Sequence, residues 1–432
     1  MVQRIGKSFK MSVFSSIFGE ETLRLLVYEH VSGGGFAEEP IPSGVLGEGF
    51  GMLRTLISDF KAGGHYVTTL LDSRLAKLNP PIGADCVVPV FSSREAKVAI
   101  RKISESADAT YIIAPETDQV LQSLVESIEQ TGAASLNCPP STIEKVANKA
   151  VLHDSLKKLR LPSPETIMFS VLDDVTEIKA TINGRLNFPL IFKPLNGVSC
   201  CGLSVVRHED QVASAVGKIT RESSSKNFVA QELINGVAAS VCLISTGSEA
   251  LSISLNKQYV TIGAPEAISS YDGGLVPFDN PLKPEAFAIA EKIVKSFQDL
   301  RGYVGVDLVL TEKEIVAVEI NPRLTTSYVG LRRVVTFNPA QAIINAVLKR
   351  ELPTNIQNCG YAYFSKIETP NPTINALQKT YKMNELVSPP FPVSGNGTAC
   401  TLISSHSATL KETMLRFSEA KKRFLSTISG GK

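Results

Sequence analysis

Short apolar runs alternate with amphipathic stretches over the first third of the chain. Residues 48–64 and 117–132 carry apolar side chains at helical spacing, and each stretch reaches a glycine that can end a helix. The runs that read as buried strands are 23–29, 65–71, 84–90 and 109–115. Strands that alternate with helices in this way predict a parallel sheet covered on both faces. We therefore expect an open α/β domain over residues 21–138.

The pattern changes after residues 139–142. Ser141 followed by Glu144 is typical of a helix start, and a second helix is expected at 149–160. The chain then contains short strands with close spacing, which predicts antiparallel pairing, at 187–194, 202–208, 227–233, 239–245 and 249–256. The later elements expected are a helix at 284–302, a hairpin of 303–310 with 314–320, a helix at 338–350, and strands at 361–368 and 398–405.

These changes divide the chain into five parts. Residues 1–20 are expected to be a flexible leader, because their weakly apolar stretch at 11–19 is too short for a signal peptide. After the first domain we expect linker helices and a small lobe at 139–230, and a larger α+β lobe at 231–350. The strands and helix of 351–432 are expected to complete that larger lobe.

Composition narrows the class of protein. The 432 residues are 43% hydrophobic and 20% charged, which favours a folded core and argues against disorder. The net charge is +2 and the basic residues are scattered along the sequence, so there is no basic run of the kind that indicates nucleic-acid binding. No apolar run approaches the roughly 18 residues of a membrane span. Seven cysteines without a CxxC pair indicate a reducing cytoplasm and no structural zinc.

The hairpin at 303–323 carries the strongest candidate chemistry. Asp307 lies in its first strand, while Glu319 and Asn321 are two apart in the second and therefore share a face. Two carboxylates and an amide oxygen are hard ligands suited to Mg²⁺. Arg323 follows and can bind a phosphate or carboxylate. The alternative is a set of solvated side chains on an exposed hairpin face, against which the apolar neighbours of Asp307 argue.

Residues 188–206 hold a second, weaker candidate. Lys193 ends an apolar strand, and a loop containing Gly197, Ser199 and Gly202 leads into the next strand. A lysine at a strand end can neutralise phosphate, and a small-residue loop exposes backbone N–H groups to a nucleotide. The order of a Walker A motif is missing. Taken alone, this segment is better explained as an ordinary surface turn.

Together the two segments resemble the ATP-grasp superfamily. The resemblance runs from about Leu23 to Leu348. Its specific parts are the segments NKAVLHDSL, KPLNGVSCCGL, QELINGVAASV, and the hairpin GYVGVDLVL with VEINPR. It implies a fold of α/β and α+β parts, with an N-terminal open α/β (pre-ATP-grasp) domain, a small flap or lid lobe, and a C-terminal α+β lobe.

The resemblance also implies site roles. Lys149 and Lys193 would hold ATP phosphates, under a flap that runs from Gly197 through Ser199 to Gly202. The adenine and ribose edge would be Gln231, Glu232 and Ile234, although no acidic residue follows Gly236 as in many relatives. Mg²⁺, or Mn²⁺ in its place, would be bound by Asp307, Glu319 and Asn321. Lys193, Asn321 and Arg323 would act in catalysis.

A narrower resemblance involves the segments VYEHVSGGGF, LGEGFGMLRTLISDF, SLNKQYV and YDGGLVPF. They are similar to the archaeal branch that includes tyramine–glutamate ligase. This implies substrate contacts from His30, Ser32, Gly33, Asn256, Asp272 and Arg332. The alternatives are a buried or capping role for His30, a plain turn at Asp272, and a solvated pair of Arg332 with Arg333.

The implied activity is ATP-dependent ligation. A carboxylate would be activated as an acyl phosphate and joined to an amine, L-glutamate with tyramine or a related amine being one such pair. A phosphotransferase on the same fold and a non-catalytic ATP sensor are the alternatives. The expected partners are small molecules, with neither nucleic acid nor membrane. A homodimer is compatible with the family, and the expected location is the cytoplasm.

Overall fold

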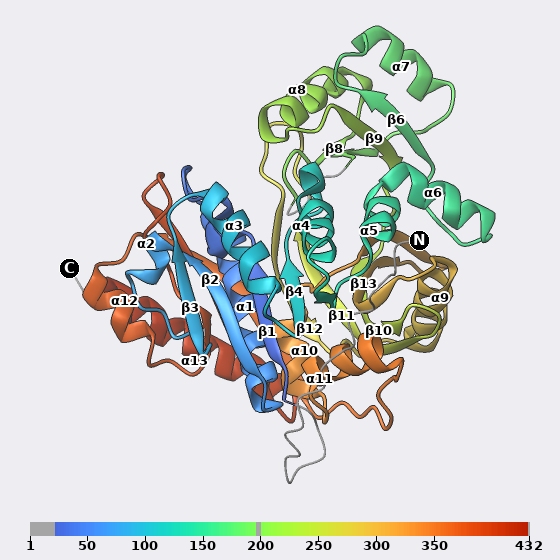
Figure 1. Ribbon diagram of the computed structural model, residues 1–432. Coiled ribbons are helices and arrows are strands. Elements are labelled where there is room, and N and C mark those ends of the chain that lie inside the picture. The colour runs from blue at the N-terminus through green and yellow to red at the C-terminus, as the bar shows by residue number, and fades with distance from the viewer. Residues whose placement is uncertain (1–21, 196–199, 431–432) are drawn as a thin grey trace, which may run out of the picture.

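The computed structural model describes residues 22–195 and 200–430, so the predicted leader at 1–20 lies outside the described residues. The N-terminal domain is a parallel sheet of order β3-β2-β1-β4-β5 (Figure 1). Its strands are β1 (Arg24–Glu29), β2 (Tyr66–Asp72), β3 (Cys86–Val90), β4 (Ala109–Ile113) and β5 (Ala134–Ser135). Its helices are α1 (Ser43–Ala62), α2 (Ser73–Ala76), α3 (Ser93–Ser104) and α4 (Val120–Glu129). The predicted open α/β arrangement is confirmed.

Helix α1 is buried on more than one side. It begins at Ser43, five residues before the predicted stretch, and its C-terminal cap is Gly63 as the sequence predicted. The predicted face of Leu53, Leu56, Ile57 and Phe60 is buried. So are Leu46, Phe50 and Met52, which points to a second packing partner besides the parallel sheet.

Two linker helices, α5 (Pro140–Ala147) and α6 (Lys149–Lys158), lead into the lid lobe. Helix α5 begins at Pro140 with Pro139 at its N-cap, so Ser141 lies inside the helix rather than capping it as the Ser141 and Glu144 pattern predicted. The lid sheet has the order β6-β9-β7-β8 and is antiparallel. Its elements are β6 (Thr166–Ser170), α7 (Val175–Asn183), β7 (Leu190–Pro194), β8 (Ser204–Val206), α8 (Val212–Glu222) and β9 (Asn227–Glu232). The prediction of uninterrupted short strands was wrong here, because α8 separates β8 from β9.

The third and largest sheet is antiparallel, with the strand order β14-β13-β10-β11-β12-β15-β17-β16. We refer to it as the large sheet. Its first strands are β10 (Val237–Thr246), β11 (Ala250–Thr261), β12 (Ser270–Val276), β13 (Arg301–Leu310) and β14 (Ile315–Asn321). The C-terminal strands are β15 (Tyr361–Pro370), β16 (Leu386–Ser388) and β17 (Thr398–Ser407). The helices are α9 (Lys283–Ser296), α10 (Tyr328–Val334), α11 (Pro339–Ile344), α12 (Ile374–Thr380) and α13 (Leu410–Ser429). Helix α9 ends at Ser296, six residues before the predicted end.

The C-terminal strands cover the second side of α1. The Phe50 and Phe391 rings meet edge to face with centroids 4.9 Å apart, and Arg54 Nη1 donates to the Leu386 carbonyl oxygen at 2.8 Å. Further along α1, Asp59 accepts hydrogen bonds from Tyr328 and Arg332. Helix α1 is therefore packed against the C-terminal half of the chain. This packing brings residues from both halves to one site.

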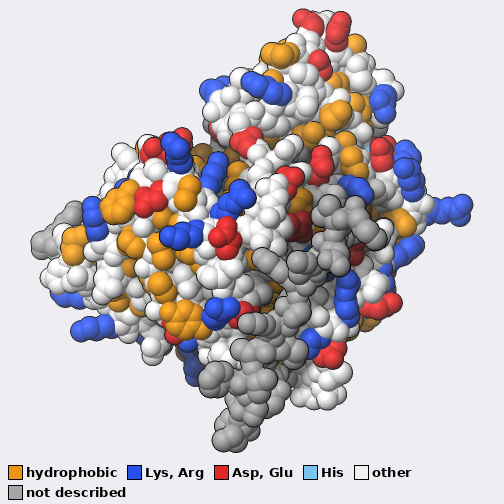
Figure 2. All heavy atoms as spheres, in the orientation of Figure 1, with side chains coloured by type: hydrophobic (Ala, Val, Ile, Leu, Met, Phe, Trp, Pro, Cys, Tyr) orange, Lys and Arg blue, Asp and Glu red, His pale blue; other side chains and the backbone are white. Residues whose placement is uncertain are grey.

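The surface matches the balanced composition. Figure 2 shows Lys and Arg side chains interspersed with Asp and Glu on the face in view. In the part of the chain that the structure describes, no helix combines the length and apolar character needed to cross a bilayer.

Candidate functional site

A cavity of about 590 Å³ lies where the three parts of the protein meet. The lid contributes Lys193 and Cys200, the large sheet contributes Asp307 and Glu319, and the N-terminal domain contributes Glu29. The segment between β9 and β10, which joins the lid to the large sheet, forms one wall. The predicted phosphate and metal residues therefore share one cavity.

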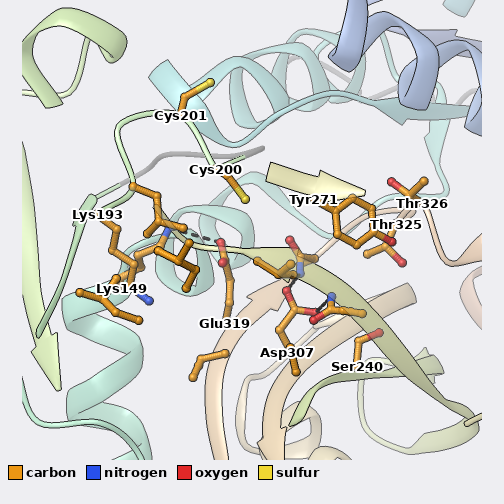
Figure 3. Close-up of a pocket in the computed structure, with 18 of the residues that line it drawn as sticks. Lys149, Lys193, Cys200, Cys201, Ser240, Tyr271, Asp307, Glu319, Thr325 and Thr326 are labelled. Atoms are coloured by element: carbon orange, nitrogen blue, oxygen red, sulfur yellow. Dashed lines mark hydrogen bonds and ion pairs between the residues drawn. The ribbon is translucent and has the colours of Figure 1, made fainter. Parts of the chain in front are cut away.

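The β13–β14 hairpin places the carboxylates face to face. Asp307 pairs directly with Glu319 in the antiparallel register, and Gly305 pairs with Asn321. Asn321 Nδ2 donates to Asp307 Oδ2 at 3.2 Å, while Gln258 Nε2 donates to Asp307 Oδ1 at 3.0 Å. Figure 3 shows Asp307 and Glu319 side by side in the middle of the cavity. The sequence could predict the face but not the contact from Gln258.

Two lysines lie on one side of these carboxylates. Lys149 is the first residue of α6, whose N-terminus is capped by the Asn148 side chain. Its Nζ lies 3.2 Å from Glu319 Oε1 and donates to the Leu195 carbonyl oxygen at 3.4 Å. Lys193 reaches the same region from β7 (Figure 3). Burial lowers the pKa of Lys193 to about 8, and the charge of Lys149 acts in the same direction. This side of the cavity is suited to phosphate.

The charges around the hairpin fit a divalent cation. Burial and the negative charge of Glu319 raise the pKa of Asp307 to about 7. Burial also opposes ionisation of Glu319, but Lys149 and Lys193 outweigh it and lower that pKa. Among the described residues no three His, Cys, Asp or Glu side chains form a metal cluster. Mg²⁺ needs only one or two carboxylates beside water and phosphate, so Asp307, Glu319 and Asn321 fit it.

Replacing Asp307 with asparagine is expected to stabilise the ligand-free protein. The pKa of Asp307 in the folded protein is raised above its ordinary value of 3.8. The ligand-free protein therefore loses stability as pH rises between about 4 and 7. D307N removes that penalty. Thermal unfolding should therefore show a higher Tm for D307N at pH 8, and the difference should shrink toward pH 5. Exposed Glu312, changed to Gln, is the control; equal Tm shifts in both variants would contradict this explanation.

Arg323 is held by the N-terminal domain. Its Nε and Nη2 both lie 3.0 Å from Glu116 Oε2. Burial opposes the guanidinium charge, but Glu116 outweighs it and raises the pKa of Arg323. Arg323 lines the cavity beside Asn321, so it can present a fixed positive charge to a reacting group.

The predicted adenine edge lies where the lid strand β9 leads into the large sheet. Gln231, Glu232 and Ile234 line the cavity as a group. Gln231 Nε2 donates to Thr166 Oγ1 at 2.7 Å, and Glu232 Oε2 accepts from the backbone N–H of Glu165 at 3.4 Å. A Cβ atom on Gly236 would lie 2.5 Å from the Leu310 carbonyl oxygen, so glycine lets this segment pass close to β13. The geometry allows a flat base to lie along this segment.

The predicted flap is only partly described. Gly197 and Ser199 lie outside the described residues. Gly202 has φ of 70°, a conformation that favours glycine, and its N–H donates to Glu222 Oε2 at 3.0 Å. Cys200 and Cys201 line the cavity, and Figure 3 shows the Cys200 side chain directed toward Glu319.

Comparison with known proteins agrees with this geometry. Residues 146–327 match the family described as the ATP-grasp domain, and residues 65–143 match the pre ATP-grasp 3 domain. This chain belongs to the ATP-grasp superfamily. It is 28% identical over 314 residues to tyramine–L-glutamate ligase of Methanocaldococcus fervens, an alignment that covers 71% of this chain and 89% of that protein. The resemblance stated from the sequence is confirmed.

Solved structures show the same fold. L-amino acid ligase from Bacillus licheniformis superposes with a TM-score of 0.65 at 15% identity, covering 93% of this chain and 98% of that one. A biotin carboxylase domain from Hydrogenobacter thermophilus, solved with MgADP, gives a TM-score of 0.67 at 12% identity, covering 93% and 90%. The predicted fold class is confirmed, and the enzyme is an ATP-grasp ligase of the class that forms C–N bonds.

Three predicted substrate residues of this ATP-grasp protein lie behind the cavity wall. His30 packs against the Phe36 ring, and burial lowers its pKa to about 4 with a smaller effect from Lys97. Ser32 Oγ donates to Glu29 Oε2 at 2.6 Å, and a Cβ on Gly33 would overlap the Tyr28 ring. His30 is half-buried, so it only partly matches the alternative interpretation of a buried histidine. The cavity surface is formed instead by the flanking residues Glu29 and Val31.

The other three predicted substrate residues are also placed away from the cavity wall. Asn256 is fully buried and bonds to Ser254 Oγ at 2.8 Å. Asp272 is exposed, while its neighbour Tyr271 lines the cavity. Arg332 is bound to Asp59 rather than solvated or facing substrate, because α10 packs on α1 at this point. None of these three side chains lines the cavity, so none is placed to contact a substrate bound there.

Sequence reasoning missed a group of residues around α1. The missed cavity residues are Glu29, Val45, Glu48, Gly49, Met52, Tyr271, Thr325 and Thr326. The one signal available was Glu48, the single charged residue in the first half of α1. Its meaning depends on contacts with residues far along the chain, which periodicity cannot show.

Proposed function

We propose that this protein is an ATP- and Mg²⁺-dependent ligase that activates a substrate carboxylate as an acyl phosphate and couples it to an amine. The observation that carries the proposal is the cluster of Lys149, Lys193, Asp307 and Glu319 in one cavity. Lysines to hold phosphates and carboxylates to hold a cation are the parts that phosphoryl transfer requires. The cavity continues beside α1, where the carboxylate and amine substrates would bind.

The first step is phosphoryl transfer. A carboxylate oxygen of the substrate attacks the γ-phosphorus, the bond to the β-phosphate oxygen breaks, and ADP leaves with the electron pair. Mg²⁺ bound by Asp307, Glu319 and Asn321 would neutralise phosphate charge. Lys149 and Lys193 hold and orient the phosphates, and most Lys193 side chains stay protonated at neutral pH because its pKa is about 8. The protein supplies position and charge rather than covalent chemistry.

The second step joins the amine. The amine nitrogen attacks the acyl carbon, the bond to the phosphate oxygen breaks, and the nitrogen loses a proton as phosphate leaves. Negative charge develops on the carbonyl oxygen, where a fixed donor lowers the barrier most. Arg323 is such a donor, because Glu116 holds its guanidinium in place before substrate arrives.

The substrate pair is proposed from the relatives. The name tyramine–L-glutamate ligase makes L-glutamate and tyramine, or a related amine, the first pair to test. Apolar side chains of Val31, Val45 and Met52 line the cavity near α1 and can contact the hydrocarbon part of either substrate. Small molecules remain the proposed partners, while Mn²⁺ in place of Mg²⁺, a homodimer and a cytoplasmic location stay predictions.

The test is release of ADP and phosphate from MgATP across a matrix of amino acids and amines. We expect release to require both partners and mass spectrometry to detect an amide in equal amount. A phosphorylated product without amide would make the protein a phosphotransferase. ATP binding without turnover in any combination would favour the ATP sensor and contradict the ligase.

A further inference from the structure

An ion pair lies at the edge of the cavity beside α1, where Glu48 lines the cavity and Lys366 is its partner. Lys366 Nζ lies 2.7 Å from Glu48 Oε1, and Thr326 Oγ1 donates to Glu48 Oε2 at 2.8 Å. Glu48 is 9% exposed, and the Lys366 side chain is 18% exposed. The pair joins residues from α1 and β15, which the sequence separates by more than 300 positions.

This pair lies apart from the phosphate end. Tyr271 lies between the two regions. Its ring centroid is 5.8 Å from Lys366 Nζ, and burial together with the negative charges of Glu48 and Asp307 raises the pKa of its hydroxyl. Figure 3 shows Tyr271, Thr325 and Thr326 on one side of Asp307, with Lys149 and Lys193 on the other. ATP and Mg²⁺ therefore do not need the Glu48–Lys366 pair, which is left for another ligand.

Both charged groups keep unused hydrogen-bonding capacity. An ionised carboxylate can accept about four hydrogen bonds and a lysine ammonium can donate three. Among the described residues, Glu48 accepts from Lys366 and Thr326, and Lys366 Nζ donates to Glu48. About two acceptor positions on Glu48 and two donor positions on Lys366 remain.

A buried ion pair contributes little to stability, since removing both charges from water opposes their attraction. Helix α1 already has apolar packing, such as the Phe50 ring on the Phe391 ring, to fix it against the C-terminal half. A second charge pair, with Glu48 in the cavity wall and Lys366 against the lining residue Tyr271, is better explained by a ligand that carries both signs of charge.

We propose that the Glu48–Lys366 pair binds an α-amino acid substrate, with Glu48 accepting from the α-ammonium and Lys366 donating to the α-carboxylate. The inference deepens the proposed ligase function and rests on it for the fate of the substrate. When a zwitterion binds beside this ion pair, the two charges of the ligand and the two charges of the protein alternate in sign. Each buried charge then has a partner of opposite sign.

The shape of the wall supports this assignment. Val45, Glu48, Gly49 and Met52 line the cavity and follow the spacing of one helical face. A Cβ on Gly49 would lie 2.6 Å from the Glu29 carboxyl group, so glycine lets α1 approach β1. The resulting surface has one charged pair with apolar neighbours, a pattern that fixes the orientation of a small ligand.

Orientation has a consequence for the reaction. If both α groups are held at this pair, the carboxylate that extends past Tyr271 toward Lys193 is the one on the side chain of the amino acid. An acidic amino acid would then be linked to the amine through its side-chain carboxylate.

The test measures ligand preference by calorimetry on the full chain in the presence of MgADP. The ligands are L-glutamate, glutarate, which lacks the α-ammonium, and 4-aminobutanoate, which lacks the α-carboxylate. The wild-type protein should prefer L-glutamate to either analogue by roughly 10- to 100-fold. E48Q should lose the preference over glutarate, and K366M should lose the preference over 4-aminobutanoate.

Asp59→Asn is the matched control, because it breaks the other ion pair between α1 and the C-terminal half, outside the cavity wall. It should lower Tm and keep the ligand preference. Equal binding of the three ligands by wild type, or unchanged preference in E48Q and K366M, overturns the inference while amide formation can still support the ligase. Amino acid binding through this pair without any amide would instead overturn the proposed function and leave the binding assignment standing.

Discussion

Replacing Glu319 with alanine is expected to lower the rate of ADP formation by about 1000-fold or more in a protein that remains folded. Glu319 has two roles in the proposed mechanism. It is one of two carboxylates for the cation, and its Oε1 is 3.2 Å from Lys149 Nζ. Without it, the cation loses a ligand and Lys149 loses the partner that positions it among the phosphates.

The fold should survive because the Glu319 side chain is 31% exposed and faces the cavity rather than the core. A coupled assay for ADP and a circular dichroism melt measure the two quantities. Glu319→Gln keeps the size of the side chain and should be nearly as inactive. Glu312→Ala, on the exposed turn of the same hairpin, should behave as wild type. Wild-type turnover in both Glu319 variants would remove the metal assignment.

Replacing Lys193 with methionine is expected to lower kcat by about 100- to 1000-fold and to raise KM for ATP. The ammonium is the charge that β7 directs toward the phosphates, and no neutral side chain can replace it. Methionine retains most of the apolar stem. Since burial already lowers the pKa of Lys193 to about 8, we expect the variant to be at least as stable as wild type.

Lys226→Met is the control for Lys193→Met, because Lys226 precedes β9 of the same lid sheet and is exposed. Steady-state kinetics with varied ATP would separate kcat from KM. A variant with normal kcat and raised KM would show that Lys193 contributes only to binding ATP. Normal values of both would remove Lys193 from the site.

The parts of this protein that sequence could predict are those set by local pattern. The parallel strands of the first domain follow from apolar runs of the right length, and the β13–β14 hairpin follows from alternation around Asp307 and Glu319. Residues two apart on a strand must share a face, so Glu319 and Asn321 were predictable from spacing alone. The resemblance to ATP-grasp proteins added Lys149 and the adenine edge, which no local rule indicates.

The substrate end was not predictable in the same way. The loop after β1 was correctly located near the cavity, but backbone direction decides which of its side chains face inward. Glu29 and Val31 line the cavity, while the half-buried His30 and the buried Ser32 do not. Arg332 shows a second cause of error, since its partner Asp59 lies 273 positions away in α1. Periodicity carries no information about such contacts.

The packing of α1 against the C-terminal strands has a consequence for how the protein is made. Phe50 reaches its partner Phe391 across 341 residues of chain. At about 5 to 20 residues per second, the ribosome needs roughly 20 to 70 seconds to supply that partner. During this interval one apolar face of α1 lacks the C-terminal residues that bury it in the folded protein. We expect the first domain to stay incomplete on the ribosome and to need a chaperone, or some other temporary cover, until the last strands emerge.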